Sequence, residues 1–434
     1  WKGLVGSEMC IRDSPNADKL KVCDVDSGTG ILKVVCGAPN VKNGMKVVVA
    51  KPGDFIPGLN INLKASKIRD VKSEGMMCSE KELEISDEHD GIIELPSETE
   101  VGTLFSELVG DEKIIFEIAI TPNRPDALGI YGIARDLSAS GIGKLRVSKI
   151  PNVEGIFKPH LNINLDQAVS SKECPLFVGR YLRSVQNRES PQWLKNRLIG
   201  IGLNPISALV DITNYLTFDR ARPLHVFDAD KLSGGLTVRR SFEGEKFHAL
   251  DDKIYDLNEG MIVITDEKEI VSLGGIIGGM KSAVSDETKN VLLEAAYFDP
   301  ISIAATGRKL QINSDARYRF ERGVDPSFTL SGSHIATKMI LDLCGGEASD
   351  IIIAGSVPSF EKKIIFDPKK VNHLIGIEVN KARQFDILKS LGFSVKEVEN
   401  KVEIIVPAWR PDVHGEVDII CLLYTSPSPR DPSI

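Results

Sequence analysis

Long apolar runs are absent from this sequence. No uninterrupted hydrophobic stretch approaches the ~20 residues that a helix needs to cross a bilayer. The chain also has no basic segment followed by an apolar core of the kind that directs secretion. We therefore expect a cytoplasmic protein with no membrane partner.

Cysteines are few and form no recognisable pattern. The seven are odd in number and scattered, with no Cys-x-x-Cys pair and no histidine cluster at zinc spacing. This arrangement is typical of a protein from a reducing compartment. It excludes a cysteine-based metal site.

An excess of positive charge is also missing. The chain has 53 Lys and Arg against 61 Asp and Glu, for a formal charge of −8, so bulk attraction to polyanions is excluded. Any contact with nucleic acid must be local. Residues 15–79 are the exception, because they hold ten basic residues against six acidic ones.

The length and composition indicate several ordinary globular domains. At 434 residues, with 42% hydrophobic and 26% charged residues, about three domains are expected. Short alternating runs bounded by turn residues predict strands up to residue 79, and mixed strand and helix patterns follow. The fold class is therefore multidomain α+β, with a small β-barrel over 15–110, a connector over 111–150 that opens as a strand at Phe116, a large α+β module over 151–355 and a small αβ, winged-helix-like module over 360–420.

The two ends have a different character from the rest. GLVGSEMCIRDS near the start and CLLYTSPSPRDPSI at the end resemble translated adapter sequence. We therefore expect residues 1–14 and 421–434 to be adapter-derived and not to belong to the native domains.

The basic segment carries the first family resemblance. Its phrases PNADKLKVCDVDSG, VVCGAPNVKNGMKVVVAKPG and SEGMMCSEKEL resemble the tRNA-binding barrel with the oligonucleotide-binding (OB) fold found in synthetases. A barrel with exposed lysines can hold a phosphate backbone, mostly through salt-sensitive electrostatics. A barrel used only for packing or assembly remains the alternative.

Six further phrases extend the resemblance from Pro15 to about Ile420. In chain order they are similar to the β-subunit of bacterial phenylalanyl-tRNA synthetase: TPNRPDALGIYGIARDL, DITNY, RPLHVFDADKL, SLGGIIGG, LLEAAYFDP and DARYRFERGVDP. The resemblance implies a tetramer of two α and two β subunits. In it the α-subunit would use ATP to activate phenylalanine, and this chain would bind phenylalanine tRNA and hydrolyse mischarged tyrosyl-tRNA. No P-loop or other activation motif contradicts this division.

Proofreading answers a physical need, because a hydrophobic pocket cannot strongly reject a ligand that only adds a hydroxyl. The resemblance assigns the editing roles to His225, Glu294, Thr213, Asn214 and Gly278. Glu294 would accept from the tyrosine hydroxyl and His225 would help to order the substrate and water. Gly278 would allow close approach of the substrate. Taken alone, each residue would more often be structural, and it is the motif context that favours the editing role.

The segment PAWRPDVHGEVDII resembles the part of the family that holds a magnesium ion. Asp412 and Asp418 match two of its carboxylates, but Cys421 and Leu422 occupy the two glutamate positions. Two carboxylates make a weak Mg²⁺ site. We expect this fragment to hold the ion poorly and the intact parent to hold it well.

Two other functions remain open from the sequence. A non-catalytic tRNA-binding or assembly protein would need only residues 15–110. A free-standing trans-editing hydrolase would share the central domain. A phosphate clamp by the arginines of RYRFERGVDP is another possibility, but interleaved opposite charges favour a salt-linked helix start.

Overall fold

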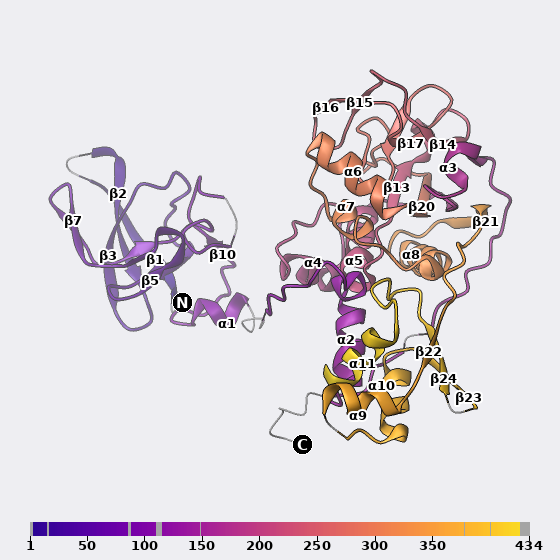
Figure 1. Ribbon diagram of the computed structural model, residues 1–434. Helices are drawn as coiled ribbons and strands as arrows, with labels where there is room; N and C mark the ends of the chain where they lie inside the picture. The colour runs from indigo at the N-terminus through magenta and orange to yellow at the C-terminus, as the bar shows by residue number, and fades with distance from the viewer. Residues whose placement is uncertain are drawn as a thin grey trace. The chain divides into compact units, whose positions relative to one another are not determined.

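The computed structural model describes residues 3–14, 17–85, 88–109, 115–147, 149–376, 378–399 and 401–425. The chain forms two compact units, Trp1–Phe116 and Glu117–Ile434 (Figure 1). None of the helices within the described ranges has both the length and the apolar character needed to span a bilayer.

The first unit is built on an antiparallel sheet with the strand order β10-β4-β1-β2-β3, in which β9 also pairs with β4. Strand β4 is buried on both faces, since Val47 and Val49 enter one apolar core while Val48 and Ala50 enter another. The elements are β1 (Leu4–Ser14), β2 (Ala17–Asp26), β3 (Ile31–Cys36), β4 (Lys46–Ala50), β5 (Phe55–Ile56), β6 (Ile61–Asn62), β7 (Ser66–Ile68), β8 (Val71–Ser73), β9 (Met76–Met77), β10 (Glu94–Leu95) and α1 (Phe105–Val109).

The predicted barrel is not closed among the residues that the structure describes, because the sheet has free ends at β10 and β3. The segment after β8 reaches β3 through the Glu74 amide, which donates to the Lys33 carbonyl at 2.7 Å. At Val35 the ladder is replaced by a side-chain contact, in which the amide donates to the Ser73 hydroxyl at 3.1 Å. A closed barrel would need continuous main-chain hydrogen bonds between β3 and the segment around β8. At Val35 a serine hydroxyl takes the place of the main-chain carbonyl.

The two ends predicted to be adapter-derived are partly ordered elements. Residues 4–14 form β1, which pairs with both β2 and β4. At the other end, residues 421–425 belong to α11 (Glu416–Thr425), while 426–434 lie outside the described residues. The origin of these two segments stays a prediction.

The second unit centres on a four-stranded antiparallel sheet of order β13-β20-β12-β21. One face of this sheet packs against α4, α5 and α8, through residues such as Leu209 and Ile340 against Val226 and Leu293. The bounds are β12 (Leu176–Arg183), α4 (Gln192–Ile199), α5 (Ala208–Arg220), β13 (His225–Asp228), β20 (Val291–Tyr297), α8 (Thr329–Cys344) and β21 (Glu347–Gly355).

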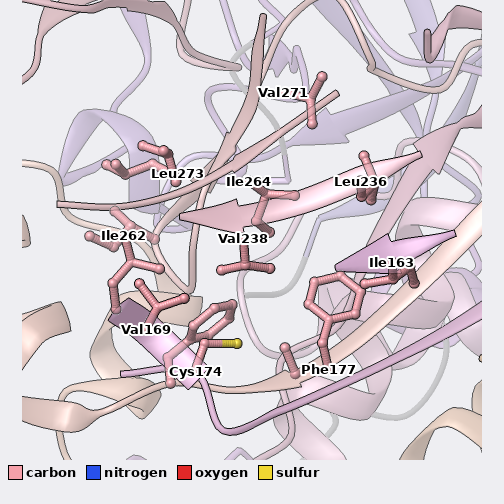
Figure 2. Close-up of a cluster of buried hydrophobic side chains, with 14 of the residues drawn as sticks. Ile163, Val169, Cys174, Phe177, Leu236, Val238, Ile262, Ile264, Val271 and Leu273 are labelled. Carbon is pink, nitrogen blue, oxygen red and sulfur yellow. The ribbon is translucent and has the colours of Figure 1, made fainter. Parts of the chain in front are cut away.

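The other face of that sheet packs against a five-stranded sheet of order β11-β14-β17-β18-β19. Figure 2 shows the buried aliphatic side chains of this second sheet meeting Cys174 and Phe177. The bounds are β11 (Ile163–Leu165), β14 (Leu236–Arg240), β17 (Ile262–Thr265), β18 (Ile270–Leu273) and β19 (Ile277–Gly278). The same unit also contains the hairpin of β15 (Lys246–His248) and β16 (Ile254–Asp256) and the helices α3 (Gln167–Ser170), α6 (Pro300–Leu310) and α7 (Asp315–Phe320).

A three-stranded sheet of order β22-β24-β23 and three helices end the chain around their own core. This confirms a small αβ module, whereas its winged-helix character stays a prediction. The bounds are η2 (Pro125–Leu128), α2 (Ile130–Ala139), η4 (Pro326–Phe328), β22 (Lys362–Phe366), α9 (Lys369–Ile375), α10 (Lys381–Ser390), β23 (Ser394–Val398) and β24 (Lys401–Val406).

The strand predicted at Phe116 is wrong, because residues 115–120 are irregular and pair with no described strand.

Candidate active site

His225 and Glu294 are direct neighbours across two antiparallel strands. His225 of β13 pairs in register with Glu294 of β20, and Phe227 pairs in the same way with Leu292. Directly opposed residues place their side chains on the same face of a sheet. Because Phe227 and Leu292 belong to the core between the two sheets, His225 and Glu294 point into that space as well.

Gly278 lies against the imidazole from the opposing sheet. A Cβ at this position would be 2.4 Å from His225 Cε1 and 2.7 Å from Nε2. The ring also makes an edge contact with Phe227, with the ring centroids 4.5 Å apart. Only glycine therefore permits the observed position of the imidazole.

Burial makes the two polar groups of this pair unusual. Glu294 is 6% exposed, and its Oε2 is buried with no hydrogen-bond partner. His225 Nε2 is likewise buried and unpartnered. Burial raises the pKa of Glu294 to about 8, with Arg222 opposing the shift, and burial lowers the pKa of His225 to about 4. At neutral pH the site thus presents an uncharged carboxyl beside an uncharged imidazole.

Arg222 is a residue near the site that the sequence reasoning missed. It is 1% exposed, and its guanidinium donates to the carbonyl of Ala296, two positions after Glu294, and to that of Asp325 at 3.4 Å. Its charge acts on Glu294 and favours the ionised carboxylate. The only sequence signal was its place three residues before His225 in RPLH.

Thr213 and Asn214 lie on α5, the helix that covers the other face of the four-stranded sheet. The Thr213 hydroxyl donates to the Val210 carbonyl of its own helix at 2.7 Å. The described hydrogen bonds connect neither residue to His225 or Glu294. The structure therefore brings together His225, Glu294 and Gly278, and the roles of Thr213 and Asn214 stay predictions.

The buried pair predicts how folding stability depends on pH. Between pH 4.5 and 6.5 the folded chain keeps a proton on Glu294 and the unfolded chain keeps one on His225, so the two effects cancel. From pH 6.5 to 8 only the folded state retains its proton, and this contribution to the free energy of unfolding falls by about 2 kcal/mol. Urea unfolding at several pH values measures this change in the free energy of unfolding. The glutamine in Glu294→Gln cannot titrate, so this variant should not show the decrease in the free energy of unfolding between pH 6.5 and 8. The same pH dependence in the variant and the wild type would contradict a raised pKa at Glu294.

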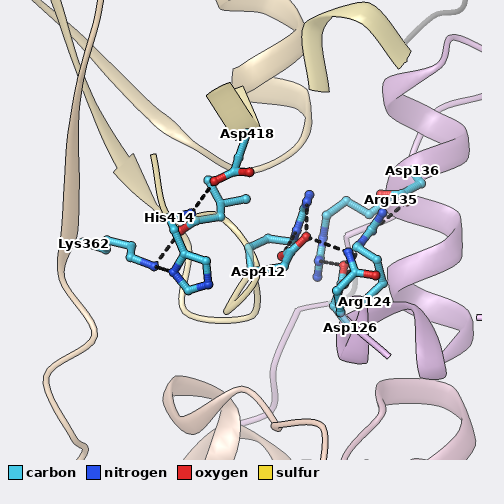
Figure 3. Close-up of polar contacts among 11 residues, drawn as sticks. Arg124, Asp126, Arg135, Asp136, Lys362, Asp412, His414 and Asp418 are labelled. Carbon is cyan, nitrogen blue, oxygen red and sulfur yellow. Dashed lines mark hydrogen bonds and ion pairs between the residues drawn. The ribbon is translucent and has the colours of Figure 1, made fainter. Parts of the chain in front are cut away.

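The two predicted magnesium ligands do not converge (Figure 3). Asp412 is held in a two-point ion pair with Arg410, at 2.8 and 2.9 Å, and also accepts from Asn123 at 3.3 Å. Burial alone would raise the pKa of Asp412, but its bonds to Arg410 hold it below the usual value.

Asp418 instead accepts the amides of His414 and Gly415 at 2.8 and 2.9 Å, which closes the turn before α11. Within the described ranges, no group of three or more His, Cys, Asp or Glu side chains is arranged to hold a metal ion. Because both oxygens of Asp412 and Oδ2 of Asp418 are already engaged, and the two side chains do not converge, Asp412 and Asp418 as they stand do not fit a Mg²⁺ ion.

The arginines of RYRFERGVDP form ion pairs within their own segment. Arg317 and Arg322 both pair with Glu321, and Arg319 pairs with Asp315. This supports the salt-linked helix start over a phosphate clamp.

Comparisons with known protein families match three parts of the chain. Residues 4–104 match a putative tRNA binding domain, residues 173–345 match the B3/4 domain, and residues 364–420 match the tRNA synthetase B5 domain. All of His225, Gly278 and Glu294 fall inside the B3/4 match.

Curated relatives named as phenylalanine–tRNA ligase beta subunits are similar over almost the whole chain. The protein from Ruegeria pomeroyi is 52% identical across 94% of this chain and 51% of its own length. Those from Paramagnetospirillum magneticum and Rhodospirillum rubrum are 50% and 49% identical, across 96% and 99% of this chain and 52% and 55% of theirs.

Among solved structures, the match to an N-terminal fragment of the phenylalanyl-tRNA synthetase beta-subunit from Pyrococcus horikoshii covers 71% of this chain and 85% of that chain. The sequence identity is 16% and the TM-score is 0.38, which is too low to bear on the fold. The chain spans about half the length of the curated relatives that it matches. With three matched domains and this identity, the chain belongs to the family of the phenylalanine–tRNA ligase beta subunit.

Proposed function

We propose that this chain binds phenylalanine tRNA and hydrolyses tyrosine wrongly attached to it. The observation that supports this most directly is the pair His225 and Glu294, whose buried Nε2 and Oε2 lack partners next to Gly278. Unpaired buried polar atoms are costly to a fold, so a site that keeps two of them together is suited to a ligand that pairs with both.

A phenol complements this pair and a phenyl ring does not. The tyrosine hydroxyl can donate one hydrogen bond and accept another, which matches an imidazole nitrogen and an uncharged carboxyl. Phenylalanine would leave both groups buried and unsatisfied. A site that hydrogen-bonds a substrate hydroxyl discriminates far more strongly than a hydrophobic pocket does.

In the reaction, water attacks the ester carbonyl, the bond from the carbonyl carbon to the ribose oxygen breaks, and tyrosine and tRNA leave. His225 and Glu294 hold the hydroxyl at the far end of the tyrosine side chain and so position the ester carbonyl for attack by water. Thr213 and Asn214 are proposed to support this site from α5. No step uses a metal ion.

The first unit is proposed to carry an OB-fold surface for tRNA. Among its described residues between 17 and 79, six basic side chains are exposed, and two of them, Lys67 and Lys72, are partly neutralised by Asp70 and Glu74. Phosphate contacts by such residues weaken as salt rises. The six are Lys33, Lys42, Lys64, Lys67, Arg69 and Lys72.

The functions of the whole subunit are part of the same proposal. By analogy with the named relatives, the intact protein pairs with an α-subunit in a tetramer of two α and two β subunits, and the α-subunit performs ATP-dependent aminoacylation. The intact parent is proposed to bind Mg²⁺ with carboxylates at the positions that Cys421 and Leu422 occupy here. The last module is proposed to be winged-helix-like.

Deacylation of two substrates by the 434-residue chain tests the proposed function. We expect tyrosyl-tRNA to be hydrolysed at least about tenfold faster than phenylalanyl-tRNA on the same phenylalanine tRNA, because only tyrosine satisfies the buried pair. Release of labelled amino acid measures both rates. Bound tRNA with hydrolysis no faster than in buffer would favour the non-catalytic tRNA-binding protein instead.

A further inference from the structure

The second unit contains a cavity of about 380 Å³ that the proposed editing site does not use. Three regions far apart in the sequence form its wall: the segment containing η2 and α2, the central module near Arg222 and Asp325, and the last module near Trp409 and Pro411. Neither His225 nor Glu294 is among its lining residues.

Aromatic rings make up much of the wall. Arg135 packs over the Trp409 ring at 4.2 Å, and Arg220 packs over the Tyr131 ring at 4.2 Å, so cationic groups alternate with flat surfaces. Such combinations of rings and guanidinium groups suit the stacking of a nucleic-acid base. The aromatic lining residues are Tyr131, Tyr297, Phe328, Phe360 and Trp409.

The charged groups of the wall favour an anion. Of the four arginines that line it, Arg135, Arg220 and Arg322 are paired with Asp126, Asp219 and Glu321, which leaves Arg222 as the cation without an ion pair. Both carboxylates of the wall are engaged, since Asp126 pairs with Arg124 and Arg135, and Asp325 accepts from the amide and hydroxyl of Ser327.

Arg222 is the least compensated cation of this wall. It forms none of the ion pairs found among the described residues, although it is 1% exposed. Asp325 and Glu294 act on its charge without forming an ion pair with it. A buried charge that lacks a direct counter-ion is costly to a fold, so an anion in contact with it would stabilise the protein.

The buried atoms without partners on this wall are all donors. They are Arg222 Nε, Arg322 Nε and Trp409 Nε1; the two arginines belong to the central module and the tryptophan to the last module. Donors without acceptors call for a group rich in oxygen acceptors. A phosphate has three such oxygens, whereas a carboxylate has two.

We propose that this cavity binds a mononucleotide, with the phosphate near Arg222 and the base among the aromatic rings. An amino acid fits less well, because its ammonium group would need a free carboxylate and both aspartates of the wall are engaged. The nucleotide can be a free molecule or the last nucleotide of an RNA strand, since both present the same chemistry.

Calorimetric titration of the 434-residue chain with adenosine monophosphate, adenosine, inorganic phosphate and the trinucleotide CCA tests the proposal. We expect adenosine monophosphate to bind at least about tenfold more tightly than adenosine, because only the nucleotide supplies acceptors for the three donors. Equal affinities, or no binding of the nucleotide, would overturn the proposal. Tighter binding of CCA than of the mononucleotide assigns the cavity to an RNA end, and equal or weaker binding assigns it to a free nucleotide.

A matched pair of tryptophan variants locates the ligand. Trp409→Phe keeps a ring but removes the indole N–H, and should lower the affinity for adenosine monophosphate about tenfold without changing that for adenosine. Trp193→Phe alters a tryptophan outside the cavity lining and should change neither affinity. Equal nucleotide affinity in Trp409→Phe and wild type would overturn the site. Should Trp409→Phe fail to fold, the comparison of nucleotide with nucleoside on the unaltered chain still decides.

Discussion

Glu294→Ala is expected to lower the rate of tyrosyl-tRNA hydrolysis about tenfold to a hundredfold, the cost of one lost hydrogen bond to a buried group. His225→Ala should have an effect of similar size, because both side chains would contact the same phenol. The side chains are strand partners in direct register, so the effects of the two substitutions should not add. Single-turnover deacylation measures each rate.

Glu294→Gln separates recognition by an uncharged group from recognition by a carboxylate. Burial raises the pKa of Glu294 to about 8, so at pH 7 the amide is a close mimic of the protonated side chain. We expect Glu294→Gln to retain most of the activity at pH 7 that Glu294→Ala loses.

His248→Ala is the matched control for His225→Ala, because this histidine lies in the same unit but pairs with Asp252 at the surface. Hydrolysis at the wild-type rate in both Glu294→Ala and His225→Ala would remove the assignment of the site.

Gly278→Ala is expected to reduce tyrosyl-tRNA hydrolysis by an amount comparable to the loss of His225. The added methyl would lie 2.4 Å from His225 Cε1 and 3.0 Å from Leu250 Cδ1, so the imidazole must leave its position beside Glu294. Overpacking of this kind also costs about 1–3 kcal/mol of folding stability. Deacylation and thermal unfolding of the same variant separate the two effects.

Gly143→Ala is a matched control, because a Cβ at that position would contact nothing within 4 Å. We expect this variant to keep both the activity and the stability of the wild type. Full activity in Gly278→Ala would show that the observed position of the imidazole is not needed for catalysis.

Local patterns in the sequence predicted part of the secondary structure. Strands were expected before residue 79, and the run KVVVA in that region is β4. This prediction succeeded because apolar spacing reports which face of an element is buried. The strand at Phe116 failed, since an apolar run forms a strand only when another strand is available to pair with it.

The chemistry of single residues was less predictable. Asp412 and Asp418 matched a metal-binding pattern, but Arg410 holds both oxygens of Asp412 and the amides before α11 hold one oxygen of Asp418. Arg222 carried no signal of its own, because its importance comes from burial beside Glu294 and not from its neighbours in the chain.

The sequence by itself indicated the family and predicted the order of the modules and five site residues, of which the structure brings together His225, Glu294 and Gly278. Only the tertiary structure decided that His225 and Glu294 are direct partners across two strands, and that Gly278 reaches them from a second sheet. The physical reason is that strand register and the stacking of sheets depend on contacts between distant segments, while sequence patterns report only local burial. The same holds for the cavity near Arg222, whose wall exists only after three separate regions have packed together.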